Sequence, residues 1–158
     1  MRIGVVKESD QETRVAIVPS SLRKLTKAGF EVVVESGAGL ASSHDDQAYI
    51  DAGASIGSRD EVLACPHVLA VGFPGIDGLA AGTNVVCVAD PFRHPDRVKA
   101  CMDAGVTLMS MDMIPRRLSR AQSMDVNSSQ DNLAGYKAVL LGAAHVPKGI
   151  PMMTTSAG

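Results

Sequence analysis

Short apolar runs alternate with helical patterns along most of the chain. The runs that predict strands are nearly continuous and rich in β-branched residues, and they span residues 2–6, 31–35, 67–71, 84–88 and 106–109. Helical patterns lie between them, over residues 19–28, 45–52, 59–64 and 95–104. Near-continuous apolar strands separated by helices indicate a parallel sheet that is buried on both faces. The predicted fold is therefore α/β, a doubly wound, mostly parallel sheet of the Rossmann-like or flavodoxin-like kind.

A longer helix is predicted from about Ser129 to Ala144, with Ser129 as a suitable N-cap. One side of this helix collects apolar residues at helical spacing, namely Leu133, Tyr136, Leu140 and Ala144. Prolines and glycines in residues 146–158 prevent another full element. We expect one domain over residues 1–145, followed by a hinge or linker over 146–158.

Composition narrows the classes of partner. The chain has 158 residues, a formal net charge of -2 and 46% hydrophobic residues, so no basic field is present to attract nucleic acid. No apolar run approaches the ~20 residues that span a bilayer, and no signal peptide is evident, which predicts a cytoplasmic protein. Cys65, Cys87 and Cys101 are widely spaced in apolar surroundings, so we expect them to be reduced and structural.

Three other features could carry chemistry but are weak signals. Gly37-Ala38-Gly39 follows a strand but lacks the third glycine of a dinucleotide fingerprint, so a plain strand-to-helix turn is favoured. The charged loop from Lys7 to Ala16 is interpreted as solvated, with an anion-binding role for Lys7 or Arg14 as the alternative. The four histidines show no ligand spacing, and no metal site is predicted.

The most informative segment is a polar loop over residues 119–125 that immediately precedes the last helix. It brings a guanidinium, an amide, a carboxylate and hydroxyls into one short stretch. These groups supply both hydrogen-bond donors and acceptors. Because binding residues concentrate on loops held by a rigid scaffold, this segment is the predicted functional site.

The motifs together resemble a known family. They comprise Lys7-Glu8 with Arg14-Val15-Ala16, residues 33–39, Ile114-Pro115-Arg116 with 119–125, residues 132–139, and the tail 151–158. Their order and content resemble the N-terminal half of the alanine dehydrogenase and pyridine nucleotide transhydrogenase family. The resemblance implies an NAD(H)-binding oxidoreductase whose second, glycine-rich NAD-binding domain is absent from this sequence.

The two branches of that family differ in chemistry. Alanine dehydrogenase supplies a lysine and a histidine to its substrate, whereas the matching segments here place Gly72 and Val88 at those positions. Transhydrogenase passes a hydride directly from NADH to NADP+, which requires orientation rather than an acid–base pair. The resemblance therefore favours the transhydrogenase alpha subunit. The alternatives are an alanine dehydrogenase-like enzyme and a non-catalytic assembly module.

The resemblance also implies site residues. The NAD-contacting pattern falls on Arg117, Leu118, Ser119, Gln122, Ser123, Met124, Asp125 and Ser128. Of these, Arg117, Gln122 and Asp125 are expected to hold the nicotinamide-ribose end during hydride transfer, with Ser128 in support. The chain carries one residue more than the family pattern after Pro115, which leaves Arg116 as an alternative to Arg117.

Partners follow from the resemblance as well. NAD(H) is expected here and NADP(H) on a partner, within an assembly that contains NADP-binding and membrane-embedded subunits. A homodimer is expected, together with the missing NAD-binding half, because the chain is interpreted as truncated or split and as inactive alone. Such partners imply a cytoplasmic location, peripheral to the inner or plasma membrane.

Overall fold

A computed structural model describes residues 1–148 and divides the chain into two units, Met1–Ile114 and Pro115–Gly158. The hinge expected over 146–158 lies almost wholly outside the described residues.

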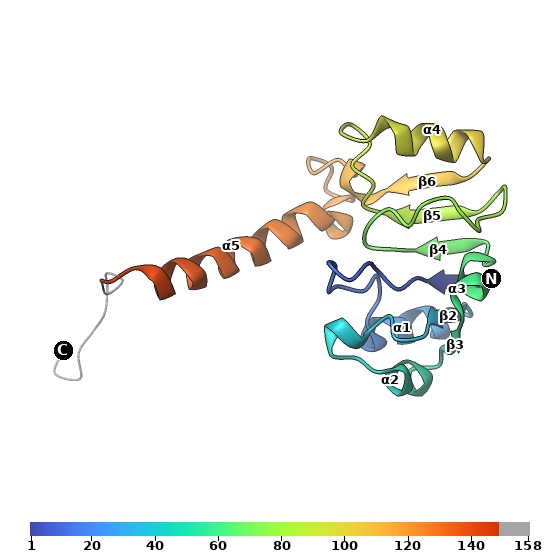
Figure 1. Ribbon diagram of the computed structural model, residues 1–158, viewed down its shortest axis with the longest axis horizontal. Helices are drawn as coiled ribbons and strands as arrows, with labels where there is room; N and C mark the ends of the chain where they lie inside the picture. The colour runs from blue at the N-terminus through green and yellow to red at the C-terminus, as the bar shows by residue number, and fades with distance from the viewer. Residues whose placement is uncertain (149–158) are drawn as a thin grey trace. The chain divides into compact units, whose positions relative to one another are not determined.

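The first unit contains a sheet of six parallel strands in the order β3-β2-β1-β4-β5-β6 (Figure 1). The strands are β1 (Arg2–Val5), β2 (Glu31–Glu35), β3 (Ser55–Gly57), β4 (His67–Leu69), β5 (Asn84–Cys87) and β6 (Thr107–Ser110). This order reverses the direction of chain progression between β1 and β4, as in a doubly wound fold. The predicted α/β class is thus confirmed, and every strand pairing is parallel.

The helices of the first unit begin and end close to the predicted positions. They are α1 (Pro19–Lys27), α2 (Asp46–Asp51), α3 (Arg59–Leu63) and α4 (Pro95–Asp103), with 3-10 turns η1 (Leu40–Ser42) and η2 (Met111–Met113). Capping residues, prolines and a glycine explain where several of these helices begin and end. Ser58 and Glu61 form a capping box on α3, and proline occupies the first turn of α1 and of α4. Gly29, beyond α1, takes a positive φ that favours glycine.

Strand β3 is the element that the sequence pattern did not predict. It has only three residues at the sheet edge, and none of them is fully buried. Its position is fixed by pairing with β2, in which Val34 lies opposite Ile56. So short a segment has too little alternation to register as a strand.

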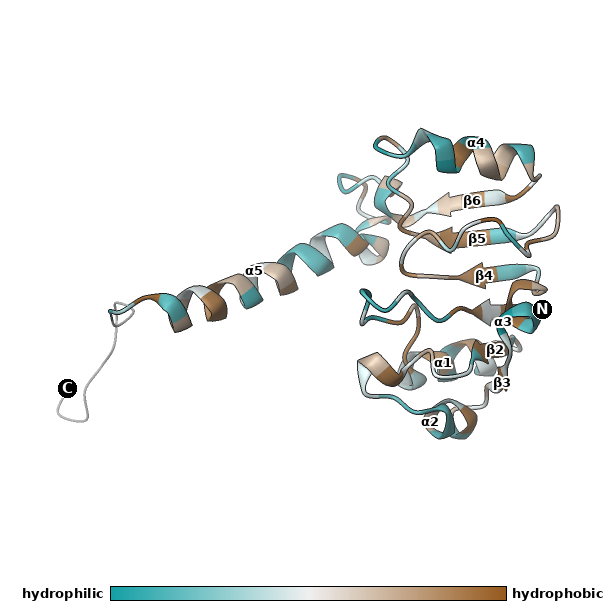
Figure 2. Ribbon diagram, in the orientation of Figure 1, coloured by the Kyte–Doolittle hydropathy of each residue, from teal (hydrophilic) through white to brown (hydrophobic). Residues whose placement is uncertain are grey.

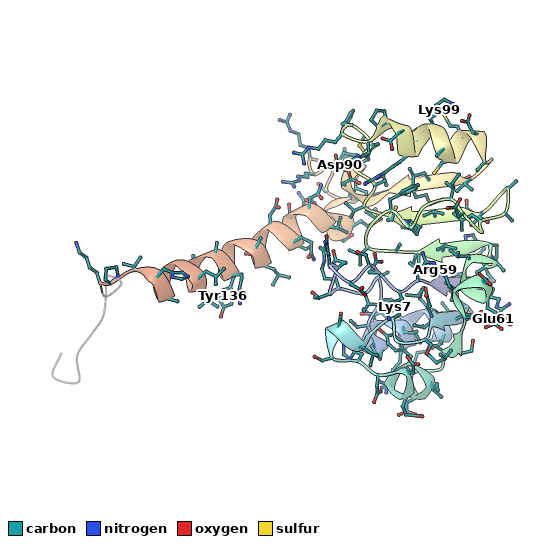
Figure 3. All side chains as sticks on the ribbon, viewed as in Figure 1. Lys7, Arg59, Glu61, Asp90, Lys99 and Tyr136 are labelled. Carbon is teal, nitrogen blue, oxygen red and sulfur yellow. The ribbon has the colours of Figure 1, made fainter. Side chains whose placement is uncertain are left out.

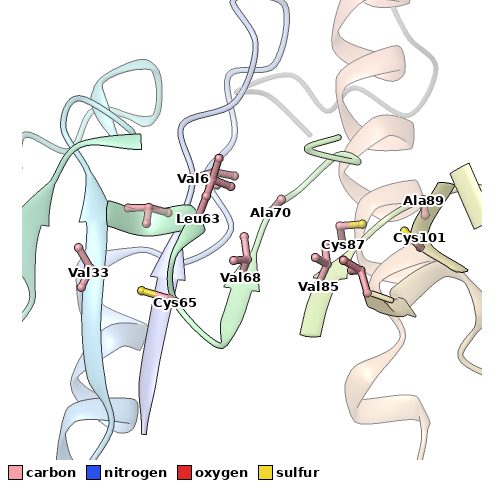
Figure 4. Packing of buried hydrophobic residues seen from close by; sticks show 12 residues of the cluster. Val6, Val33, Leu63, Cys65, Val68, Ala70, Val85, Cys87, Ala89 and Cys101 are labelled. Carbon is pink, nitrogen blue, oxygen red and sulfur yellow. The ribbon is translucent and has the colours of Figure 1, made fainter. Parts of the chain in front are cut away.

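Two apolar clusters cover opposite faces of the sheet. Ile3, Val5, Val32 and Val34 face Leu22 of α1 and Tyr49 of α2. The alternate residues of these strands face the other way, where Val6 and Val33 join Val62 of α3, Val68, Val85 and Cys101 of α4 (Figure 4). Successive side chains of a strand point to opposite faces, so both strands are buried on both sides. In Figure 2, β4 and β5 are coloured as hydrophobic toward their carboxyl ends. Cys65, Cys87 and Cys101 are buried free thiols, as predicted.

Gly4 in β1 lets helix α3 approach the sheet closely. A Cβ built at this position would lie 2.3 Å from the carbonyl oxygen of Val62. That contact is with backbone, which cannot move aside as a flexible side chain can. A glycine is therefore required here for α3 to reach the sheet.

The second unit contains η3 (Gln122–Met124) and the twenty-residue helix α5 (Val126–His145). Its N-cap is Asp125, so the prediction that the helix starts at Ser129 was wrong. The Asp125 carboxylate accepts a hydrogen bond from the Ser128 amide at 3.0 Å, and the helix gains a turn. The Ser129 hydroxyl instead donates to the carbonyl oxygen of Asp125.

The predicted apolar side of α5 is not buried in the structure. Leu133, Tyr136 and Leu140 are 61%, 67% and 48% exposed. Between Leu133 and Ala144, Lys137 is the one charged residue, so apolar side chains surround the second half of the helix (Figure 2). A helix that is apolar on several sides is normally covered by other protein.

Replacing Gly4 by alanine is expected to lower the free energy of unfolding by about 2 kcal/mol or more, because α3 must move away from β1. Urea unfolding followed by circular dichroism measures the change. Gly72→Ala is the matched control. A Cβ at Gly72 meets only the Glu8 carboxylate, at 3.6 Å, and should change stability by less than about 0.5 kcal/mol. Equal stability of the two variants would contradict the close approach.

Candidate functional site

The predicted polar loop lies in the second unit and consists of consecutive tight turns. The Leu118 amide donates a hydrogen bond to the carbonyl oxygen of Pro115, and the Ala121 amide donates to the carbonyl oxygen of Leu118 at 2.8 Å. The 3-10 turn η3 follows, after which Asp125 takes an extended conformation and α5 begins. Except for the buried Ala121, the side chains over residues 116–124 are exposed. The backbone turns back on itself and leaves the polar side chains accessible.

Asp125 joins the loop to the helix. One carboxylate oxygen accepts from the Ser128 amide, and the other accepts from the Ser128 hydroxyl at 2.6 Å. These two hydrogen bonds, the hydroxyl first, lower the pKa of Asp125 below its ordinary value of 3.8, and the nearby Arg116 charge acts in the same direction. Asp125 therefore stays a carboxylate at lower pH than an ordinary aspartate does. Its side chain is only 8% exposed.

The two neighbouring arginines have different surroundings. Arg116 donates from Nη2 to Oδ2 of Asp131 at 3.2 Å, and its Nε lies 3.8 Å from Oδ1 of Asp125. Arg117 is exposed and makes no hydrogen bond or ion pair with the described residues. The structure thus brings Arg116, the alternative site arginine, to Asp125, and leaves the Arg117 guanidinium available.

The remaining predicted residues supply polar and apolar surface. Leu118 and Met124 are 59% and 51% exposed. Ser119 is exposed, and Ser123 donates from its hydroxyl to the carbonyl oxygen of Arg120 at 3.4 Å. The Gln122 side chain has no hydrogen-bond partner within residues 1–148. Residues 116–128 contain no histidine or cysteine, so the loop offers fixed charges and hydrogen bonds rather than a proton-exchanging group.

In the first unit, the place where doubly wound sheets bind ligands is the carboxyl end of β1 and β4. Glu8 fills it. Its carboxylate accepts hydrogen bonds from the amides of Val71 at 2.6 Å and Gly72 at 3.2 Å. A carboxylate on these amides would repel a phosphate. Sequence reasoning missed this role, although the position of Glu8 just after the first strand was a usable signal.

Charged side chains in and beside the loop after β1 pair mostly with other residues of the first unit. Arg14 forms two side-chain hydrogen bonds with the Glu12 carboxylate, at 2.8 and 2.6 Å, which raise the pKa of Arg14 and lower that of Glu12. Arg59 donates to the Lys7 carbonyl oxygen at 3.2 Å and to the Glu35 carboxylate at 3.1 Å. Figure 3 labels Lys7 and Arg59. A cavity of about 220 Å³ beside this loop is lined by Lys7 together with Glu8, Asp10 and Glu12. Its acidic lining favours the interpretation as a solvated loop over an anion site.

The Gly37-Ala38-Gly39 segment also has a structural explanation. The Asp46 carboxylate accepts from the Ser36 hydroxyl and from the Gly37 amide, both at 2.8 Å. A Cβ at Gly39 would lie 2.6 Å from the Tyr49 ring. These glycines form a turn that packs against α2. The Gly37 amide in this turn is already hydrogen-bonded to the Asp46 carboxylate.

Neither cysteine chemistry nor a metal cluster is evident in the described part of the chain. Burial raises the pKa of Cys87 to about 12, which keeps it a thiol. No group of three or more histidine, cysteine or acidic side chains converges among residues 1–148. Within the same residues, no helix is long and apolar enough to cross a membrane.

The sequence and the fold both match known proteins. Residues 4–134 match the family described as alanine dehydrogenase/PNT, N-terminal domain. The whole chain aligns at 39% identity with 44% of an NAD(P) transhydrogenase alpha-subunit polypeptide of Rhodospirillum rubrum. The solved transhydrogenase of Sinorhizobium meliloti has a TM-score of 0.91 and 42% identity over the whole of this chain and 48% of that chain.

An alanine dehydrogenase from Bacillus subtilis is 31% identical over 94% of this chain and 39% of its own length. The chain therefore spans less than half of each of these relatives. The family match covers most of the sequence. The chain belongs to the alanine dehydrogenase/PNT N-terminal domain family.

Proposed function

We propose that this chain is an NAD(H)-binding component of an NAD(P)+ transhydrogenase, in which hydride passes between NADH and NADP+. The observation that supports it most is the loop over 117–128, which presents fixed donors and a low-pKa carboxylate but no group that titrates near neutrality. Direct hydride transfer between two nicotinamides needs orientation of the rings and no proton exchange with the protein.

The residues of the loop fit the nicotinamide end of the dinucleotide. Arg117 and Gln122 have unused donors in the described structure, suited to the oxygens of a carboxamide or a ribose. Asp125 accepts from Ser128 through both carboxylate oxygens and lies beside Arg116, and its proposed part is to accept in addition from a ribose hydroxyl. Leu118 and Met124 provide exposed apolar contact for a flat ring. The bound nicotinamide supplies the hydride, and these residues hold it in place.

Another polypeptide segment is proposed to bind the diphosphate. The sequence contains no G-x-G-x-x-G fingerprint after a strand, and Glu8 occupies the amides between β1 and β4. Helix N-termini in a glycine-rich turn are the usual site for this group. Our proposal is that a further NAD-binding segment provides it, and that the chain alone is inactive.

The proposed assembly also contains NADP(H)-binding and membrane-embedded subunits, which would hold this chain at the cytoplasmic side of the membrane. A homodimer is included in the proposal. The exposed apolar side chains of α5, among them Leu133, Tyr136 and Leu140, support coverage of this helix by other protein.

Isothermal titration of the chain with NADH is expected to show a dissociation constant well above micromolar, because the diphosphate contacts are missing. Adding a glycine-rich NAD-binding segment from a relative, as a separate polypeptide, should tighten binding. Micromolar or tighter affinity of the chain by itself would refute this division of the site.

Asp125→Asn is expected to slow hydride transfer about tenfold in the assembled enzyme, because the amide preserves the cap but loses the charge and an acceptor. Stopped-flow measurement of NADH oxidation by NADP+ gives the rate. Asp103→Asn, which removes an exposed carboxylate of α4 paired with Lys99, is the matched control and should leave the rate unchanged. An unchanged rate in Asp125→Asn would remove this residue from the site.

The lowered pKa of Asp125 predicts how α5 responds to acid. The carboxylate stabilises the folded state fully above its unfolded pKa of 3.8, and this stabilisation is lost as the pH falls through the lower folded value. The Ser128 amide signal in NMR spectra should therefore stay constant down to about pH 4 and shift below it. A transition between pH 5 and 7 would contradict the assigned hydrogen bonds.

A further inference from the structure

One half of the sheet has a face that no helix of the first unit covers. The parallel register places one residue from each of four neighbouring strands in a row on this face: Val5, Leu69, Val86 and Met109. Val5 is fully buried, Leu69 and Val86 are half-buried, and Met109 is 49% exposed. Exposure therefore increases from the middle of the sheet toward the β6 edge.

The direction of chain progression explains why this half is uncovered. From β1 to β3 the chain advances toward one edge of the sheet, and from β4 to β6 it advances toward the other. Right-handed connections that advance in opposite directions fall on opposite faces. Accordingly, α1 and α2 pack on the face of Val5, whereas α4 and the connection between β4 and β5 pack on the face of Val68.

The uncovered surface is apolar. We call the part formed by Leu69, Val86 and Met109 the open face. The burial patterns of β5 and β6 alternate along each strand, whereas β1 and β2 each have three consecutive buried residues. Parallel sheets are almost always covered by helices on both faces. The open face therefore needs a covering helix.

Helix α5 has the complementary surface. Its exposed side chains Leu133, Tyr136 and Leu140 lie on one side at helical spacing. Val139 and Leu141 are 66% and 51% exposed, and they point about 100° to either side of Leu140. A single sheet face covers one side of a helix. A dimer offers α5 more cover, because it supplies a sheet face and a second α5.

We propose that α5 of one copy packs on the open face of a second copy, and that α5 of the second copy packs on the open face of the first. A two-fold axis makes the two contacts equivalent, so the exchange closes a dimer. This inference rests on the homodimer of the proposed function and goes beyond it, because it names the surfaces that join the copies.

Charge favours a second copy as the occupant. The next row on the same face is also free of acidic, lysine and arginine side chains, and consists of His67, Asn84 and Thr107. Between Leu133 and Ala144 of α5, Lys137 is the one charged residue. A second copy therefore brings no like charge against the open face.

The size of the surfaces favours two contacts over one. Strands of three or four residues, such as β4, β5 and β6, span only about 10–13 Å, so one helix on this face buries little area. Two equivalent contacts double that area and bring it closer to the ~1,000 Å² that a specific interface needs.

Analytical ultracentrifugation of the full 158-residue chain without NADH measures the dimer. The unmodified chain is expected to dimerise with a dissociation constant of about 1–10 µM. Met109→Lys and Leu140→Glu should each weaken dimerisation about tenfold or more, because each places a charge in both contacts. Met102→Lys is the matched control. Met102 is 74% exposed on α4, which packs on the other face, so its replacement should leave the dimer unchanged.

A mixture of the two variants tests the exchange itself. A dimer of one Met109→Lys copy and one Leu140→Glu copy keeps one contact intact and brings lysine to glutamate in the other. The mixture should therefore dimerise more tightly than either variant alone. Pairing of two α5 helices would make Met109→Lys neutral, and pairing of two open faces would make Leu140→Glu neutral. Either result would overturn the proposal.

A nuclear Overhauser measurement on the unmodified chain needs no variant to fold. In a mixture of copies with labelled methionine methyl groups and unlabelled copies, the Met109 methyl group of one copy should contact the Tyr136 ring of the other. The same contact within a monomer, or the lack of any such contact, would contradict the exchange. NADH is absent throughout, so a failed dimer and a failed NADH titration are separate results.

Discussion

The carboxylate of Asp125 is the contact on which the candidate site depends. It accepts the amide and the hydroxyl of Ser128, begins α5, and lies beside the guanidinium of Arg116. Because one carboxylate serves the helix terminus and the ion pair together, the direction of the helix and the end of the loop are fixed by the same atoms. The cap is the main reason why the pKa of Asp125 is lowered, so its carboxylate stays charged at lower pH than an ordinary aspartate does.

Carboxylates have a corresponding structural task in the first unit. Glu8 bonds the amides that follow β4, and Asp46 bonds an amide and a hydroxyl in the turn after β2. Both places resemble positions where doubly wound domains hold phosphate. In this chain protein side chains occupy them, so the Rossmann-like order of the strands does not by itself provide a dinucleotide site. Strand order and binding function are separate properties here.

The apolar pattern was sufficient to predict five of the strands and the four helices of the first unit, because burial on both faces leaves long runs such as residues 31–35. It did not predict β3, which is held by pairing with β2 rather than by its own sequence. The start of α5 was misplaced because Asp125, Ser128 and Ser129 are all good N-caps. Only the extended backbone of Asp125 decides among them. Side-chain geometry was likewise needed to find the roles of Glu8 and Arg116.

The proposed function rests on a chemical difference between two reactions of this family. Reductive amination of a carbonyl, with ammonia as the nitrogen source and NADH as the reductant, requires proton-exchanging groups near the substrate, and such groups must titrate near the working pH. At Gly72, where the resemblance placed a lysine in alanine dehydrogenase, this chain has only a backbone amide bonded to Glu8. The loop over 117–128 adds two guanidinium groups, Arg117 and Arg120, and the Asp125 carboxylate. Groups of fixed charge orient a bound molecule equally well across the neutral pH range, which suits the proposed transfer of hydride without a proton.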